Sequence, residues 1–176
     1  KEGVTWLSYP VLERAPGVKN AFSTREGGVS EGIWSTMNLS YTRGDDPEHV
    51  TENFRRFAKA VGFRPEDNVV DIVTSDQTHT TNIRRVTEKD RGSGITRERS
   101  FHDIDGLITD TPDVVLATFY ADCVPLYFVD PVHRAIGLSH SGWRGTVNKM
   151  GAATIKAMQE TFGTDPADLL TAIGPS

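Results

Sequence analysis

One cysteine and two of the five histidines are the residues of this sequence whose types and positions could carry chemistry. Cys123, His79 and His140 each lie at the end of an apolar run typical of a β-strand, and the ends of neighbouring strands can converge on one edge of a sheet. Two neutral imidazoles and one thiolate form a three-ligand set for a borderline-soft divalent ion such as zinc. Three protein ligands leave a fourth position for water or substrate, which is the arrangement of catalytic rather than structural zinc.

From the residues alone, three interpretations of this set stay open. Cys123 follows His79 by 44 positions and precedes His140 by 17, so no short ligand spacing joins them. The first interpretation is structural, a buried cysteine and two hydrogen-bonded histidines. The second is metal ligation, and the third is a Cys–His pair whose thiolate attacks a carbonyl carbon. The remaining histidines lie in a helical turn, a charged loop and a hairpin turn, where solvated imidazoles are expected: His49, His102 and His133.

The stretch HSGWRG, residues 140–145, supports a ligand site at His140. In this stretch a strand is followed by Ser-Gly-Trp-Arg-Gly and then by a helix. This order directs helix N-terminal amides and one guanidinium toward a common point, where an anion such as phosphate would bind. Taken singly, Arg144 is equally explained by a surface ion pair and Trp143 by a place in the core. Together they favour a site.

The composition is that of an ordinary globular enzyme or binding protein, with 37% hydrophobic and 24% charged residues among 176. A chain of this length is expected to form one domain, 1–176. The net charge of -5 and the lack of a basic block exclude the footprint of a duplex-binding protein, so no nucleic-acid polymer is expected as a partner. No apolar run approaches the roughly 20 residues of a membrane span, and no secretion signal opens the chain. The single cysteine excludes an internal disulfide and fits a reducing compartment, so a soluble cytoplasmic protein is predicted.

Hydrophobic patterning predicts a mixed β-sheet core with at least two covering helices, an α+β or α/β fold. One helix is predicted to begin at the Asp46-Pro47 pair and to end at Gly62, and a second to begin at Gly145. Charge and glycine content predict a mobile surface loop over 87–99. The run 114–120 is apolar enough for a strand buried on both faces. The predicted strands or strand-bearing runs are 4–9, 18–24, 68–79, 83–86, 104–110, 114–120, 125–130, 134–140 and 169–173.

Seven stretches, in order along the chain, resemble the YfiH/YlmD family: FSTREGGVS, MNLSY, GDDPEHV, SDQTH, DGLITD, ADCVP and HSGWRG. The similarity runs from about Phe22 to Ser176, and the Gln-Thr-His, Ala-Asp-Cys-x-Pro and His-x-Gly-Trp-Arg-Gly elements are highly specific in combination. The family carries the names polyphenol oxidoreductase (laccase), purine nucleoside phosphorylase and peptidoglycan editing factor. The resemblance implies a single YfiH-like (cysteine-hydrolase-like) α/β domain. Family members continue past the IGPS of this chain into further strands, so the domain is expected to be incomplete at its C-terminus.

The resemblance also implies a ligand set and an activity. His79, Cys123 and His140 would be the active-site metal ligands, usually for zinc. The implied reactions are phosphorolysis of adenosine, inosine or 5'-methylthioadenosine and hydrolytic deamination of adenosine, with a purine nucleoside and phosphate as small-molecule partners. For deamination, Asp122 beside the cysteine is a candidate proton shuttle by its position only.

Phosphorolysis requires phosphate beneath the ribosyl carbon and stabilisation of a cationic sugar, which is mainly positioning and electrostatics. Arg144 and Arg25 are the predicted anion contacts, and Arg25 precedes a Gly-Gly pair where backbone amides are free to point at a ligand. Asn38 and Gln77 are predicted to contact the base or the ribose, although each could instead satisfy turn backbone.

Two alternative functions stay open. A copper-dependent polyphenol oxidoreductase of the multicopper type needs a trinuclear cluster, generally held by His-x-His elements, and five histidines without a His-x-His do not supply it. Copper binding in vitro is compatible with this set, because Cu(II) outcompetes Zn(II) at most nitrogen and sulfur sites, but it would say little about the physiological reaction. An amidase-like peptidoglycan editing factor would use Cys123 as nucleophile and His140 as base, which excludes zinc ligation by the same sulfur. The sequence does not indicate an oligomeric state.

Overall fold

The computed structural model describes residues 3–63 and 71–176, which divide into two compact units. The first unit contains the described residues of Lys1–Pro10 and Lys19–Val69, and the second contains those of Val11–Val18 and Val70–Ser176. The mixed α+β class predicted from the patterning is confirmed, whereas the single domain over 1–176 stays a prediction.

The first unit is organised around helix α1 (Pro47–Val61), whose ends lie where the sequence predicts them. The Asp46 side chain accepts a hydrogen bond from the Glu48 amide at 2.8 Å, which satisfies one of the free N–H groups of the first turn. Gly62 ends the helix in the left-handed conformation, with a φ of 77°, that a side chain would disfavour. Val50 and Phe54 bury the apolar face. A short helical turn, η2 (Gly32–Trp34), lies in the loop before α1.

The predicted strands 4–9 and 18–24 are much shorter in the structure. Only β1 (Trp6–Leu7) and β2 (Phe22–Ser23) pair, in antiparallel orientation. The Asn20 side chain accepts from the backbone amide of Tyr9 at 2.6 Å and donates to its carbonyl at 3.3 Å. A side-chain amide thus takes the place of a backbone ladder, and the strands end early.

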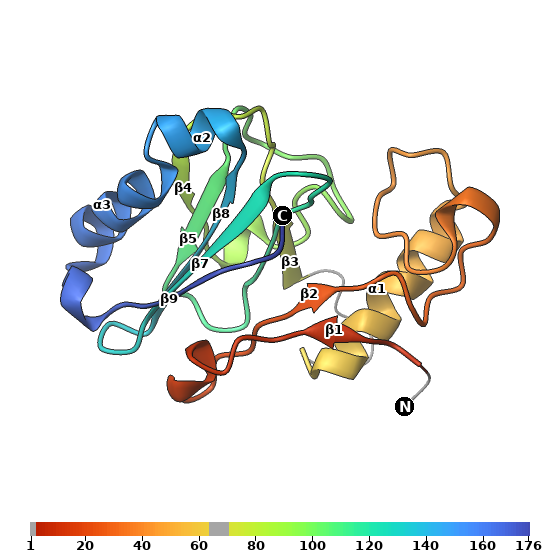
Figure 1. Cartoon of the computed structure of the whole chain (residues 1–176), viewed down its shortest axis with the longest axis horizontal. Helices are drawn as coiled ribbons and strands as arrows, with labels where there is room; N and C mark the ends of the chain where they lie inside the picture. Colours follow the sequence, from red (N-terminus) through yellow and green to blue (C-terminus); the bar gives the residue numbers. More distant parts are fainter. Residues whose placement is uncertain (1–2, 64–70) are drawn as a thin grey trace. The chain divides into compact units, whose positions relative to one another are not determined.

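The second unit is built on a five-stranded sheet in the order β4-β5-β8-β7-β9 (Figure 1). Strands β4 and β5 are parallel and the other neighbours antiparallel, so the predicted mixed sheet is confirmed. Residues Ile108, Phe128, Ala135 and Met158 form the apolar cluster between the sheet and its covering helix. The strand bounds are β4 (Ile83–Arg85), β5 (Gly106–Thr109), β7 (Val124–Asp130), β8 (Ala135–Ser141) and β9 (Leu170–Ile173).

The helix predicted to begin at Gly145 is two helices, α2 (Trp143–Val147) and α3 (Met150–Phe162). Lys149 adopts a φ of 60° between them, which interrupts the helical backbone. Helix α3 buries Met150 and Met158 against the sheet, as predicted, and runs along it in Figure 1, whereas Val147 on α2 is exposed. Because of this break, α2 follows the end of β8 as a separate helix and does not continue into α3.

A smaller parallel pair, β3 (Ile72–Thr74) with β6 (Val115–Ala117), adjoins the site. The prediction of a continuous strand over 114–120, buried on both faces, is wrong, because β6 ends at Ala117 and its residues are half-buried. Beyond it the Gln77 side chain, rather than a strand, bonds both backbone groups of Phe119. Positions 68–70 of the predicted run lie outside the described residues.

The segment 87–99, predicted to be a mobile surface loop, is tied to β3 by backbone hydrogen bonds, and its mobility stays a prediction. Its first residues form η4 (Glu88–Asp90), which a capping box at Thr87 begins. The Thr74 amide donates to the carbonyl of Ser93, and the Gly92 amide donates to that of Ile72, both at 3.0 Å. Because these bonds continue the edge of β3, Ser93 is fully buried.

Two short turns complete the second unit, η1 (Leu12–Arg14) beside β9 and η5 (Pro166–Asp168) after α3. No helix in the described ranges is both long and apolar enough to cross a bilayer.

Candidate metal centre

Three segments of the second unit bring His79, Cys123 and His140 together. His140 is the last residue but one of β8, and Cys123 immediately precedes β7. Cys123 therefore begins a strand rather than ending one, contrary to the expectation from the apolar run before it. The antiparallel register pairs Val124 with Ser141, so the start of β7 lies beside the end of β8. His79 lies in the turn that follows β3.

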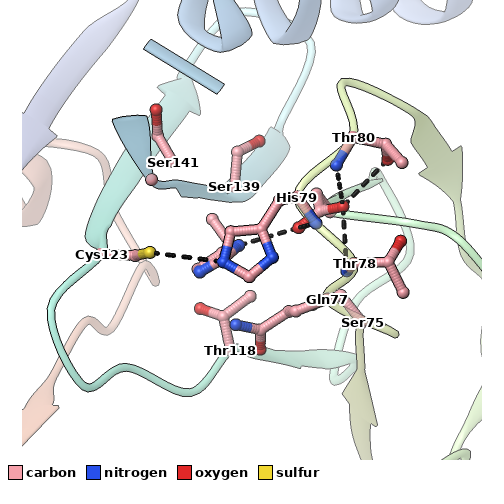
Figure 2. A network of polar contacts seen from close by, with 12 residues as sticks. Ser75, Gln77, Thr78, His79, Thr80, Thr118, Cys123, Ser139 and Ser141 are labelled. Carbon is pink, nitrogen blue, oxygen red and sulfur yellow. Dashed lines mark hydrogen bonds and ion pairs between the residues drawn. The ribbon is translucent and has the colours of Figure 1, made fainter. Parts of the chain in front are cut away.

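The geometry of the three side chains fits a single metal ion. Their ligand atoms all lie within 4.8 Å of one another, and Sγ of Cys123 is 3.8 Å from Nε2 of His79. Figure 2 shows the Cys123 sulfur directed at the His79 ring. Sulfur and nitrogen ligands of a tetrahedral zinc ion are roughly 3.5 Å apart, given Zn–S and Zn–N bonds of about 2.3 and 2.0 Å. A small closing movement of these side chains would therefore suffice for coordination. The soft thiolate and two imidazoles suit zinc or copper.

Asp105, which precedes β5, contacts two of the three candidate ligand residues and was not predicted from the sequence. It is fully buried, and its Oδ1 accepts a hydrogen bond from Nδ1 of His140 at 2.8 Å. The backbone amides of Thr78, His79 and Thr80 also donate to its two carboxylate oxygens, at 3.2, 3.1 and 2.7 Å. The residue stands in the DGLITD stretch, but its partners are distant along the chain, so no local pattern indicates the role.

The electrostatics of the site follow from burial and these hydrogen bonds. Desolvation by burial opposes ionisation of Asp105, but hydrogen bonds from His140, Thr80 and His79 outweigh it and hold its pKa below the usual range. Burial raises the pKa of the Cys123 thiol, and the charges of Asp122 and Asp105 raise it further. His140 is only 4% exposed, so its ring lies beneath the site rather than at its mouth.

A cavity of about 470 Å³ opens over the centre. Its lining includes His79, Cys123, Asp122, Gly142 and Arg144. A Cβ atom on Gly142 would lie 2.6 Å from the Cys123 sulfur and 3.2 Å from the His79 ring, so only glycine leaves the thiol and the imidazole their present positions. Asp122 is exposed in this lining, as a proton shuttle would require.

The Trp143-Arg144 pair of the HSGWRG stretch lies at this cavity. Trp143 is 72% exposed, so the interpretation of this indole as a core residue is wrong. The Arg144 guanidinium carbon lies 5.3 Å from the centre of the indole ring. Arg144 forms no hydrogen bond or ion pair with the described residues, which leaves its donors available to an anion.

The other predicted substrate contacts have structural partners. Gln77 bonds to the Phe119 backbone at both ends of its amide, 2.6 and 2.7 Å. In the first unit, Nη2 of Arg25 donates to two loop carbonyls, at 3.0 and 3.3 Å. Asn38, also in that unit, donates to Asp45 and accepts from the Ser40 amide. These contacts match the structural alternative, and a substrate role for any of the three stays a prediction.

Of the remaining histidines, His102 is largely exposed, as expected. His49 is partly exposed, 3.9 Å from Asp45. His133 is held more firmly than a solvated imidazole, because its Nδ1 lies 2.9 Å from the buried carboxylate of Asp130.

The chain is similar to several known proteins of one family. A family model described as multi-copper polyphenol oxidoreductase laccase matches residues 19–176. Purine nucleoside phosphorylase YlmD of Bacillus subtilis is 36% identical over 159 residues, which cover 88% of this chain and 55% of that protein. The crystal structure of YlmD from Geobacillus stearothermophilus has a TM-score of 0.85 at 35% identity and covers 97% of this chain and 62% of that one. The hypothetical protein YfiH of Bacillus licheniformis has a TM-score of 0.81 at 37% identity, over 89% and 57%.

The chain thus spans a little more than half the length of these relatives. The family model matches nearly all of the chain, and the solved relatives share its fold at more than 30% identity. This protein therefore belongs to the multi-copper polyphenol oxidoreductase laccase family, which includes YfiH and YlmD.

Proposed function

We propose that this protein is a zinc-dependent purine nucleoside phosphorylase, with His79, Cys123 and His140 as the zinc ligands. The observation that carries the proposal is the convergence of these three ligand atoms beneath an open cavity. The relatives named purine nucleoside phosphorylase supply the substrate class. Because the chain matches only part of each relative, the activity and substrates of the whole protein belong to this proposal.

The reaction breaks the N-glycosidic bond of a purine nucleoside, joins a phosphate oxygen to the ribosyl carbon and transfers a proton to the departing base. A bound zinc ion would supply a Lewis acid at the floor of the cavity. Arg144 would hold the phosphate, because its exposed guanidinium faces the cavity without a carboxylate partner among the described residues.

The expected nucleosides are adenosine, inosine and 5'-methylthioadenosine. We also propose hydrolytic deamination of adenosine at the same centre, with Asp122 moving the proton. This carboxylate is exposed in the cavity lining next to Cys123, so it is positioned to exchange protons with solvent.

Metal analysis combined with a phosphate-dependent assay tests the proposal. Protein purified without added metal should contain about one zinc per chain and release hypoxanthine from inosine only when phosphate is present. Cys123→Ser should lose both the zinc and, on the order of a hundredfold or more, the activity. His102→Asn is the matched control, because this imidazole is 77% exposed and outside the trio. A wild-type protein that folds but contains no stoichiometric metal would contradict the proposal.

The same measurements separate the alternatives. Full activity after complete chelation would favour a thiol hydrolase, although the raised pKa of Cys123 is opposite to that of an activated cysteine nucleophile. Oxygen uptake with a phenol after copper loading would identify an oxidase activity, which the family description favours. Ammonia release from adenosine without phosphate would report the deaminase activity. We expect zinc-dependent phosphorolysis to exceed the oxidase reaction.

A further inference from the structure

The Asp105 carboxylate accepts hydrogen bonds from both of the segments that carry the histidines. Oδ1 accepts from Nδ1 of His140 at 2.8 Å and from the His79 amide at 3.1 Å. Oδ2 accepts from the amides of Thr78 and Thr80, at 3.2 and 2.7 Å, and from the Thr80 hydroxyl at 2.9 Å. A fully buried carboxylate persists only with such compensation. The role of Asp105 therefore follows from where its donors lie, namely on the His140 ring and on residues 78–80.

The contact with His140 decides which ring nitrogen is available to a metal. An ionised carboxylate only accepts hydrogen bonds, so the 2.8 Å contact requires a proton on Nδ1. Nε2 then keeps its lone pair and becomes the ligand atom. The strands hold this arrangement in place, because the His140 amide donates to the Asp105 carbonyl at 2.7 Å where β8 passes β5.

The contacts with 78–80 decide where the second imidazole points. His79 adopts a φ of 68°, a conformation that residues other than glycine seldom take. Three successive amides surround the Asp105 carboxylate, and their hydrogen bonds compensate for that conformation. Figure 2 shows the His79 ring extending toward Cys123, away from Thr78 and Thr80.

We propose that Asp105 is a positioning residue for the metal centre, which sets the ligand atom of His140 and the direction of His79 with one carboxylate. It acts through the two imidazoles and does not touch the metal. The inference rests on the proposed zinc site and deepens it, because it names the group that prepares the site before the ion binds.

Replacing Asp105 by asparagine tests the dual role. An amide offers one accepting oxygen and one donating nitrogen, so it cannot accept from both His140 and the turn amides. If the nitrogen faces His140, Nδ1 must accept and the proton moves to Nε2, which removes the ligand lone pair. If it faces the turn, it meets the N–H groups of Thr78 and Thr80. Zinc affinity, measured by competition with a chromophoric chelator, should fall roughly 10- to 100-fold.

Asp103→Asn is the matched control. Asp103 is an exposed carboxylate two positions away that accepts from the Thr78 hydroxyl but contacts neither histidine. Its replacement should change zinc affinity less than about threefold. Cobalt substitution adds a spectroscopic readout, because the thiolate-to-cobalt band should weaken or shift in Asp105→Asn only. Wild-type zinc affinity and cobalt spectrum in a folded Asp105→Asn protein, even one with a lowered unfolding temperature, would overturn the inference.

A measurement on the unaltered protein keeps the inference testable if Asp105→Asn does not fold. Long-range proton–nitrogen NMR of the imidazoles reports the tautomer of each histidine. In the metal-free wild type at neutral pH, His140 should carry its proton on Nδ1, and zinc should then shift its Nε2 resonance. A proton on Nε2 of His140 would overturn the role of Asp105. Absence of zinc binding by a protein with the Nδ1 tautomer would overturn the proposed function instead, so the two failures differ.

Discussion

Each unit of this protein contains a buried polar cluster, and the two clusters are completed differently. In the first unit, the Asn53 amide nitrogen donates to Ser30 and to the carbonyls of Thr36 and Asn38, and its oxygen accepts from the Val29 amide. This cluster closes on itself and holds the loop before α1 against the helix. Its bonds use both ends of the amide, so it needs no ligand.

In the cluster around Asp105, the carboxylate has protein partners, but the ligand atoms beside it converge on one region. The carboxylate is satisfied by protein donors, yet the side chains that it holds end in ligand atoms within 4.8 Å of one another. Two nitrogen lone pairs and a sulfur directed at one region are unfavourable unless a cation or a proton joins them. Convergence of ligand atoms, rather than burial of polar groups, therefore distinguishes a ligand site from a structural cluster.

The largest effect that this comparison predicts is at Gly142. An alanine Cβ would lie 2.6 Å from the Cys123 sulfur, so Gly142→Ala should displace a ligand and reduce zinc affinity at least a hundredfold. Chelator competition measures the loss. Gly151→Ala on α3 is the control, since its Cβ would meet only Leu126 at 3.8 Å. Equal zinc affinity in both variants would mean that the centre tolerates crowding and is not preorganised.

Asn53 should affect stability and not metal binding. Asn53→Ala removes both ends of a fully buried amide and leaves several partners unpaired, so the free energy of unfolding should fall by about 2–4 kcal/mol. Urea titration measures the change, and the exposed Lys59→Ala should cost less than about 0.5 kcal/mol. Loss of zinc from folded Asn53→Ala protein would contradict the claim that the first cluster affects stability and not metal binding.

The two clusters can also be tested at acidic pH, because each contains an aspartate whose pKa is lowered. Hydrogen bonds from Ser30 and Asn38 lower the pKa of Asp45. An unfolded aspartate titrates near pH 3.9, so a depressed folded-state pKa contributes stability that is complete above that pH and is lost as pH falls through the folded-state pKa. The unfolding temperature of the metal-free protein should therefore decrease below about pH 4.

Asp45→Asn should lower the unfolding temperature at pH 6 more than at pH 3, since the wild-type advantage is lost in acid. Thermal scans at the two pH values measure the difference. An unfolding temperature lowered equally at both would show that ionisation of Asp45 contributes nothing to the first cluster.

The smallest effect on stability is expected at Trp143. With 72% of its surface exposed, Trp143→Ala should change the free energy of unfolding by less than about 0.5 kcal/mol. Met158→Ala on the buried face of α3 should cost about 2–5 kcal/mol. Equal losses in calorimetry for these two variants would contradict the placement of the indole at the cavity mouth.

Elements with local signals were predictable from the sequence. Helix α1 begins at an aspartate cap and ends at a glycine, and both signals act within a few residues of the chain. The hairpin of β7 and β8 follows from two apolar runs around a short turn. The predicted strands are too long at β1 and β6, where the side chains of Asn20 and Gln77 take the place of strand pairing, and the contacts of the 87–99 segment with the edge of β3 had no local signal.

The candidate site divides in the same way. Cysteine and histidine after apolar runs favour a three-ligand set by their chemistry, and Arg144 and Trp143 favour a ligand site by their order after His140. Asp105 carries no such sign, because its partners His79 and His140 lie 26 and 35 positions away.

The ends of α1, the β7–β8 hairpin, a candidate ligand set and the family could be predicted from the sequence alone. Only the folded chain shows that the ligand atoms meet, that α2 separates from α3 and that Asp105 bonds both the His140 ring and the His79 amide. These features differ in the sequence separation of the residues involved. Caps and turns depend on neighbours along the chain, whereas strand register and burial join residues that only the folded chain brings together.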